Sequence, residues 1–137
     1  MRNLCLMLAS AAALAGCTTA PPPQARSAAS EQRLQHLLAG KVPGQARSCL
    51  ASGRSSDMII IDQDTVLFRD GARRFWRSEL RRPCPQLASG HYTLVIRSFG
   101  GQGLCAGDIV ELADLTTGTT AGSCVWGDFV PYVKAVR

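Results

Sequence analysis

The stretch that decides the fold is MIIIDQDTVLFRDGARRFWRSEL, residues 58–80. The β-branched run at residues 58–61 and the apolar run at residues 65–69 are typical of strands, and the polar residues 62–64 between them favour a turn. Asp70-Gly71 is a strong hairpin signal. A further strand follows at residues 73–80, with Trp76 and Leu80 on one face and Phe75 on the other. The stretch therefore predicts three successive strands joined by short turns.

The segments on either side continue this pattern. Residues 46–51, 91–99, 109–113, 123–126 and 129–136 are candidate strands, separated by a Gly-rich turn at residues 100–103 and a loop at residues 116–122. Before them, Ser30 is a plausible N-cap, and leucines at 34, 37 and 38 predict one short helix over residues 31–39. We expect a mainly β domain, a small disulfide-stapled barrel or sandwich of six to eight short strands preceded by one short helix.

The N-terminus has the layout of an export signal. Residues 1–3 carry one positive charge, residues 4–14 are apolar except for Ser10, and Leu14-Ala15-Gly16-Cys17 resembles the bacterial lipobox. The resemblance implies cleavage before Cys17, diacylglycerol on its sulfur and acylation of the new amino group, with palmitate among the chains. The alternative is ordinary signal peptidase cleavage after Ala15.

These features predict the organisation and the address of the chain. Residues 1–16 are expected to be a lipoprotein signal peptide, residues 17–30 a lipidated flexible tether around three prolines, and residues 31–137 a single β-rich periplasmic domain. Thr18, rather than Asp, follows Cys17 and favours the outer membrane facing the periplasm. The expected location is the cell envelope, where nucleic acid is not an expected partner.

Positive charge is concentrated in one segment. The whole chain has a formal net charge of +5, and residues 69–82 contain six arginines against Asp70 and Glu79. On a strand, Arg73, Arg77 and Arg81 share the face opposite Trp76 and Leu80, so we expect these three to form a solvated surface for an anionic partner. Anionic lipid, cell-wall polymer or an envelope protein would suit it. The alternative is that these charges only keep the domain soluble.

Four cysteines remain after Cys5 in the signal peptide and Cys17 in the lipobox. An even number in a small exported domain predicts two disulfides, and spacing alone leaves all three connectivities open. Simple meander parity favours neighbours in sequence. No two of the four lie within 15 residues, so the close ligand pairs of a metal site are missing and no metal is expected.

No pattern in the sequence predicts catalysis or a cofactor. His91 and Asp108 with a serine resemble no nucleophile elbow, and the Gly-rich run lacks the Lys-Ser/Thr ending of a phosphate loop. We therefore expect a non-catalytic envelope lipoprotein that binds a partner or supports the cell surface. The alternatives are a small protein inhibitor of a cell-wall hydrolase such as lysozyme and, less favoured, a hydrolase acting on cell-wall material.

Three motifs carry a family resemblance. Cys84-Pro85-Gln86-Leu87, residues 104–109 (LCAGDI) and residues 123–131 (SCVWGDFVP) resemble a family of small uncharacterised proteobacterial envelope proteins, over about residues 46–132. The resemblance implies an architecture and no mechanism. It also implies a pairing of Cys84 with Cys124, which leaves Cys49 with Cys105.

Overall fold

The computed structural model describes residues 25–55, 57–97 and 103–136. The predicted signal peptide, Cys17, the tether up to residue 24 and most of the Gly-rich turn lie outside the described residues. Within the described ranges, one α-helix, α1 (Ala28–Leu38), precedes ten strands, and a 3-10 helix, η1 (Pro85–Ser89), interrupts them. The strands are β1 (Lys41–Pro43), β2 (Cys49–Leu50), β3 (Met58–Ile60), β4 (Thr65–Asp70), β5 (Arg74–Glu79), β6 (Tyr92–Val95), β7 (Leu104–Cys105), β8 (Ile109–Asp114), β9 (Thr120–Val125) and β10 (Phe129–Lys134).

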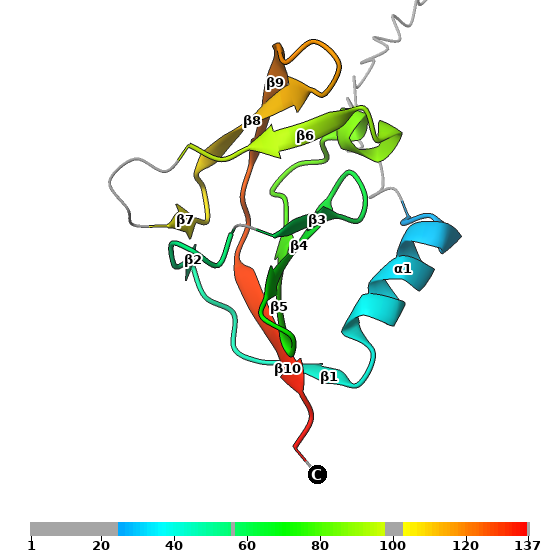
Figure 1. The fold of residues 1–137 in the computed structure, drawn as a ribbon, viewed down its shortest axis with the longest axis vertical. Coiled ribbons are helices and arrows are strands. Elements are labelled where there is room, and N and C mark those ends of the chain that lie inside the picture. Colours follow the sequence, from blue (N-terminus) through cyan, green and yellow to red (C-terminus); the bar gives the residue numbers. More distant parts are fainter. Residues whose placement is uncertain (1–24, 56, 98–102, 137) are drawn as a thin grey trace, which may run out of the picture.

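The strands form three sheets. The largest has the order β1-β10-β5-β4-β3, the second is β6-β8-β9, and β2 pairs with β7. All pairings are antiparallel. Figure 1 shows the three-stranded sheet at one end of the molecule and the β1–β10–β5 strands at the other, with α1 beside the larger sheet. The mainly β prediction is confirmed, and of its two alternatives the sandwich fits, because the described strands do not close into a barrel.

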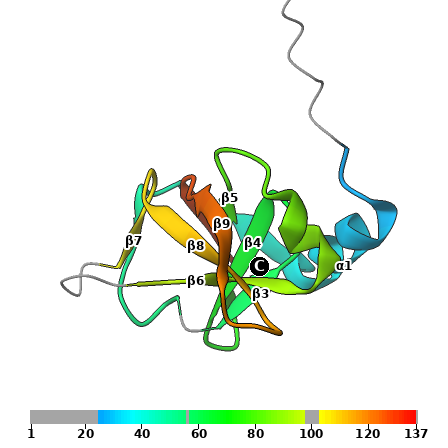
Figure 2. The same cartoon turned by 90° about the horizontal axis from the view of Figure 1, so that it is seen from above.

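The main core lies between the sheets. Phe68 of β4 is fully buried there, with its ring centroid 5.4 Å from Trp126 and 6.1 Å from Phe129. Tilted ring pairs at these distances suit the quadrupoles of the rings. The second core lies on the other face of the large sheet, where Leu67 and Phe75 pack beneath Leu34 of α1. Figure 2 shows α1 on one side of β4 and β7 on the other. Since β4 is covered on both faces, its apolar run is continuous rather than alternating.

Helix α1 starts earlier than predicted. Its N-cap is Ser27, whose hydroxyl accepts a hydrogen bond from the Ser30 N–H at 3.1 Å, whereas Ser30 itself donates to the carbonyl of Ile61 at 3.2 Å. The predicted N-cap at Ser30 and start at residue 31 were wrong because a second serine lies one helical turn upstream. Residues 25–30 consequently belong to the fold and not to the tether.

The strand count was also too low. β1 and β7 were missed because strands of three and two residues show no measurable alternation. β9 begins at Thr120, inside the predicted loop, since its exposed small residues resemble a turn. The prediction of one buried and one solvated face for β5 was wrong as well, because Phe75 is buried beneath α1.

Two disulfides staple the sheets. Cys49 and Cys105 lie directly opposite each other in the β2–β7 pair, with Cα atoms 4.0 Å apart. Cys84, just before η1, is bonded to Cys124 of β9, and both are buried in the main core. This is the pairing that the family resemblance implies, and it differs from the pairing of sequence neighbours.

Candidate anion-binding site

The excess of positive over negative charge in the described chain lies at one end of the large sheet. This end, where β10 stops and the β4–β5 turn lies, is called the basic end. It carries two carboxylates, Asp57 and Asp70, and six cations. The six cations are Lys41, Arg54, Arg69, Arg73, Arg74 and Lys134. The other described residues hold seven cations against eight carboxylates. The net positive charge of the described residues is therefore local rather than spread over the molecule.

On the helix side of the sheet, three cations surround a shallow hollow. Lys41 and Lys134 are direct cross-strand partners in β1 and β10, and Arg73 in the β4–β5 turn lies beside them. Opposed residues of antiparallel strands project to the same face. The hollow has a volume of about 260 Å³, and its remaining lining residues are small: Ala39, Gly40 and Ala72.

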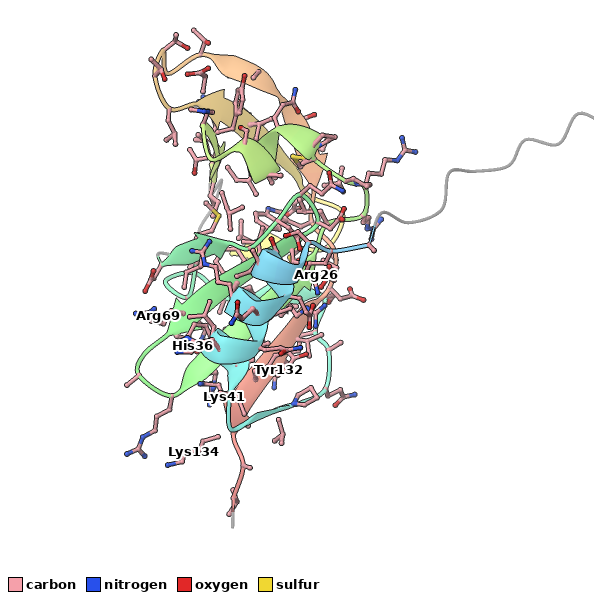
Figure 3. The ribbon with its side chains drawn as sticks, turned by 90° about the vertical axis from the view of Figure 1, so that its right-hand side faces the viewer. Arg26, His36, Lys41, Arg69, Tyr132 and Lys134 are labelled. Atoms are coloured by element: carbon pink, nitrogen blue, oxygen red, sulfur yellow. A yellow bond between two sulfur atoms is a disulfide. The ribbon has the colours of Figure 1, made fainter. Side chains whose placement is uncertain are left out.

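The three cations differ in how firmly they are held. The Lys41 ammonium donates to the carbonyl of Leu37 at 3.1 Å and lies 5.1 Å from the centroid of the Phe75 ring. The side chains of Arg73 and Lys134 are exposed, and neither has a hydrogen-bond or ion-pair partner in the described ranges. Figure 3 shows Lys41, Arg69, Lys134 and the exposed His36 around the C-terminal end of α1, whereas Arg26 lies at the other end of the helix.

On the opposite side of the sheet, Arg73 and Lys134 also border a wider cavity of about 540 Å³. Here Asp70 accepts a hydrogen bond from the Trp76 indole at 3.1 Å, and the Nε of Arg54 and an Nη of Arg74 lie 3.7 and 3.6 Å from its carboxylate. These ion pairs are too long for hydrogen bonds, so the guanidinium groups keep donors for a ligand. The carboxylate of Asp70 nevertheless neutralises part of the charge on this side.

Arg73 is the one member of the predicted arginine surface that lies at the basic end. The Arg77 side chain is only 27% exposed and donates to Glu79 and to the Tyr132 hydroxyl. Burial lowers the pKa of Arg77, but the charge of Glu79 and the Tyr132 hydrogen bond outweigh it and hold the pKa above its usual value. Arg81 lies past the other end of β5, with its guanidinium beside Gly107. The three arginines therefore do not form one surface, because α1 covers the middle of that face.

The second cluster of charges is internally neutralised. Arg26 donates to Asp62 at 2.5 Å, to Glu31 at 3.0 Å and to the Thr65 hydroxyl, and lies 3.7 Å from Glu79. Burial raises the pKa of Asp62, but hydrogen bonds from Arg26 and from two backbone N–H groups outweigh it and lower this pKa below its usual value. Arg26 thus ties the start of α1 to the β3–β4 turn and has little capacity left for a ligand.

The residues considered for catalysis have local structural roles. Asp108 accepts a hydrogen bond from the Cys105 N–H at 2.7 Å and so stabilises the β7–β8 turn. His91 is exposed, and its backbone carbonyl accepts from the Leu115 N–H. Within the described ranges, no three His, Cys, Asp or Glu side chains are grouped to hold a metal ion, and no helix is long and apolar enough to span a membrane.

Comparison with known proteins identifies a family without a described activity. A model described as "Family of unknown function (DUF6491)" matches residues 1–118, which includes the basic end except for Lys134 and stops before the SCVWGDFVP motif. The match confirms that the domain is of an uncharacterised family. No curated protein and no solved structure matches the chain.

Proposed function

The chain belongs to the DUF6491 family, a family of unknown function, and we propose that it is a non-catalytic envelope lipoprotein whose basic end binds an anionic envelope component. The observation that carries this proposal is the clustering of six cations at one end of the sheet, two of them without a partner among the described residues. Clustered like charges disfavour the compact state. Arg73 and Lys134 form no ion pair among the described residues that would offset this cost, which supports a role for them in binding rather than in stability.

The chemistry of the cluster suits phosphate and carboxylate groups. Arginine offers a planar fork of N–H donors, and lysine offers a compact charge with three donors. The envelope presents both acceptor groups on lipid headgroups and wall polymers. Because these contacts lie at an exposed surface, each is weak, and binding is expected to fall as salt rises.

Anchoring through Cys17 would raise the effective concentration of the domain at such a surface. Seven residues separate Cys17 from Ala25, the first described residue, and an extended chain of this length spans roughly 20 Å at ~3 Å per residue. A tethered domain gains from weak contacts that would not hold a free one. Thr18 at the position after Cys17 supports an outer-membrane location facing the periplasm.

The non-catalytic part of the proposal is supported by the roles of the polar groups. Asp108 is engaged in its own turn, and Asp62 is neutralised by Arg26. The one carboxylate tied to an arginine and the other capping a turn both have a structural role, which supports the proposal that neither was placed for catalysis.

Sedimentation of the full chain carrying Cys17→Ser, and hence no lipid, tests the binding. The partners are vesicles of phosphatidylglycerol, vesicles of phosphatidylcholine and purified cell wall. We compare the pair Arg73→Gln/Lys134→Gln with the matched pair Arg47→Gln/Arg82→Gln, which removes the same charge from exposed positions elsewhere.

The first pair should abolish salt-sensitive binding to phosphatidylglycerol or wall, and the second should retain it. Equal losses in both pairs would mean that net charge, and not the basic end, causes binding. Intact-mass analysis of the native protein tests the anchor, and cleavage after Ala15 without lipid would contradict it.

A further inference from the structure

Three of the cations on the helix side of the basic end are arranged as a row, whereas a fourth, Arg69, lies over the Phe75 ring and is paired with Asp57. Lys41 faces Lys134 directly in the β1–β10 register. Arg73 lies on the other side of β10, in the β4–β5 turn immediately before the first residue of β5. We propose that Lys41, Lys134 and Arg73 form a subsite for one doubly charged phosphate group. This inference rests on the proposed function and narrows its ligand from an anionic component to a phosphate-bearing one.

The row is unfavourable in the absence of a ligand. Like charges directly opposite each other on antiparallel strands destabilise a sheet, and Lys41 and Lys134 are such a pair. No carboxylate is among the described residues that line this hollow. On the other side of the same sheet end, by contrast, Asp70 lies among the arginines. The cost of the like-charge pair is removed when an anion binds between the two ammonium groups.

The hollow is open because of the residues that surround it. Ala39 and Ala72 carry only a methyl group, and Gly40 none, so the volume of about 260 Å³ between the cations is left unfilled. The Lys41 ammonium is held by the Leu37 carbonyl and the Phe75 ring, while the side chains of Arg73 and Lys134 make no such contact among the described residues and can adjust. A fixed cation beside two adjustable ones can close around a small anion.

The number and kind of donors favour phosphate over carboxylate. A phosphate monoester carries a charge close to −2 at neutral pH and has three acceptor oxygens, whereas a carboxylate carries −1 and has two. Three cations from three chain segments match the first better in both charge and geometry. The fourth oxygen of a monoester joins the phosphate to a larger molecule. Because the hollow opens to solvent, that molecule can extend outward from it.

Thermal unfolding of the full chain carrying Cys17→Ser tests the subsite with inorganic phosphate, acetate and chloride at equal ionic strength. In the chain with an intact basic end, phosphate should raise the unfolding midpoint more than acetate does. The midpoints in acetate and in chloride should differ little. In low salt without phosphate, Lys134→Gln should itself raise the midpoint by about 1–4 °C, because it removes the like-charge pair.

The affinity for phosphate distinguishes the row from other cations. Lys134→Gln or Arg73→Gln should weaken binding about tenfold, the effect of losing one hydrogen bond to a charged group. Arg82→Gln, an exposed cation elsewhere, should change neither the midpoint nor the affinity. Equal responses to phosphate and acetate, or an unchanged phosphate response in both Lys134→Gln and Arg73→Gln, would overturn the inference.

Two further probes separate the sources of phosphate. Soluble glycerol phosphate and vesicles of phosphatidic acid are compared at the same total phosphate, and stronger binding to either identifies its source. If phosphate binds at this row but vesicles and wall do not sediment with the chain, the subsite stands and the proposed envelope function fails. If envelope binding depends on the basic end but phosphate and acetate act alike, the function stands and this inference fails.

Discussion

Removal of the Cys84–Cys124 disulfide is expected to cost more stability than removal of the Cys49–Cys105 disulfide, although the Cys84–Cys124 bridge closes the shorter loop. The two bridges span 40 and 56 residues. The chain-entropy model assigns about 4 kcal/mol to each loop, and the longer one has an advantage of only ~0.3 kcal/mol. Loop length therefore does not decide the order.

Burial decides it. Cys84 and Cys124 are 6% and 3% exposed and belong to the main core, whereas Cys49 is exposed and Cys105 half-buried. Replacing the buried pair with alanine leaves a cavity where the two sulfur atoms were. At the cost per unit of cavity volume found for other buried truncations, this cavity destabilises the domain by a further ~1–2 kcal/mol. The double variant Cys84→Ala/Cys124→Ala should thus lose about 1 kcal/mol more than Cys49→Ala/Cys105→Ala. Urea unfolding at 25 °C measures both, and an equal or reversed order would refute the role assigned to the core.

Three further predictions concern the core, the charged cluster at α1 and a close backbone approach. Phe68→Ala should cost about 3–5 kcal/mol in urea unfolding, while Leu115→Ala, at a side chain 62% exposed, should cost under ~0.5 kcal/mol; similar losses would mean that Phe68 is not central. The lowered pKa of Asp62 contributes stability that is present above its unfolded value of about 4 and is lost as pH falls through the folded value. Asp62→Asn should flatten this acid limb in a pH series of thermal midpoints, and an unchanged limb would contradict the assignment. Gly127→Ala should destabilise the domain strongly, because the added Cβ would lie 2.0 Å from the Glu79 carbonyl oxygen; an unchanged unfolding midpoint would show that this approach is looser.

The β core of the fold could be predicted from residues 58–80 because the apolar runs and the turn residues in that stretch are local features of the sequence. The runs around Val66 and Phe75 are long enough to identify strands, and Asp70-Gly71 identifies the turn. The short strands β1 and β7 could not be predicted, since they exist only through pairing with β10 and β2. Propensity says little about a strand of two or three residues that is stabilised by distant partners.

The candidate site was only partly accessible from the sequence. Arg73 was identified, because the arginine-rich segment is contiguous, but Arg77 was assigned to the wrong environment since nothing local shows that α1 covers it. Lys41 and Lys134 are 93 residues apart and come together only in the β1–β10 register. A site assembled across strands from single lysines leaves no motif in the sequence.

The central claim, that the basic end is the ligand-binding surface, is tested most directly by mapping amide chemical shifts. The ¹⁵N-labelled full chain carrying Cys17→Ser is titrated with phosphatidylglycerol vesicles, or with soluble wall fragments if those bind better. The largest shifts are predicted at Gly40, Lys41, Ala72, Arg73 and Lys134, and they should disappear in Arg73→Gln/Lys134→Gln. Shifts that instead centre on residues 104–111, with the basic end unchanged, would contradict the account.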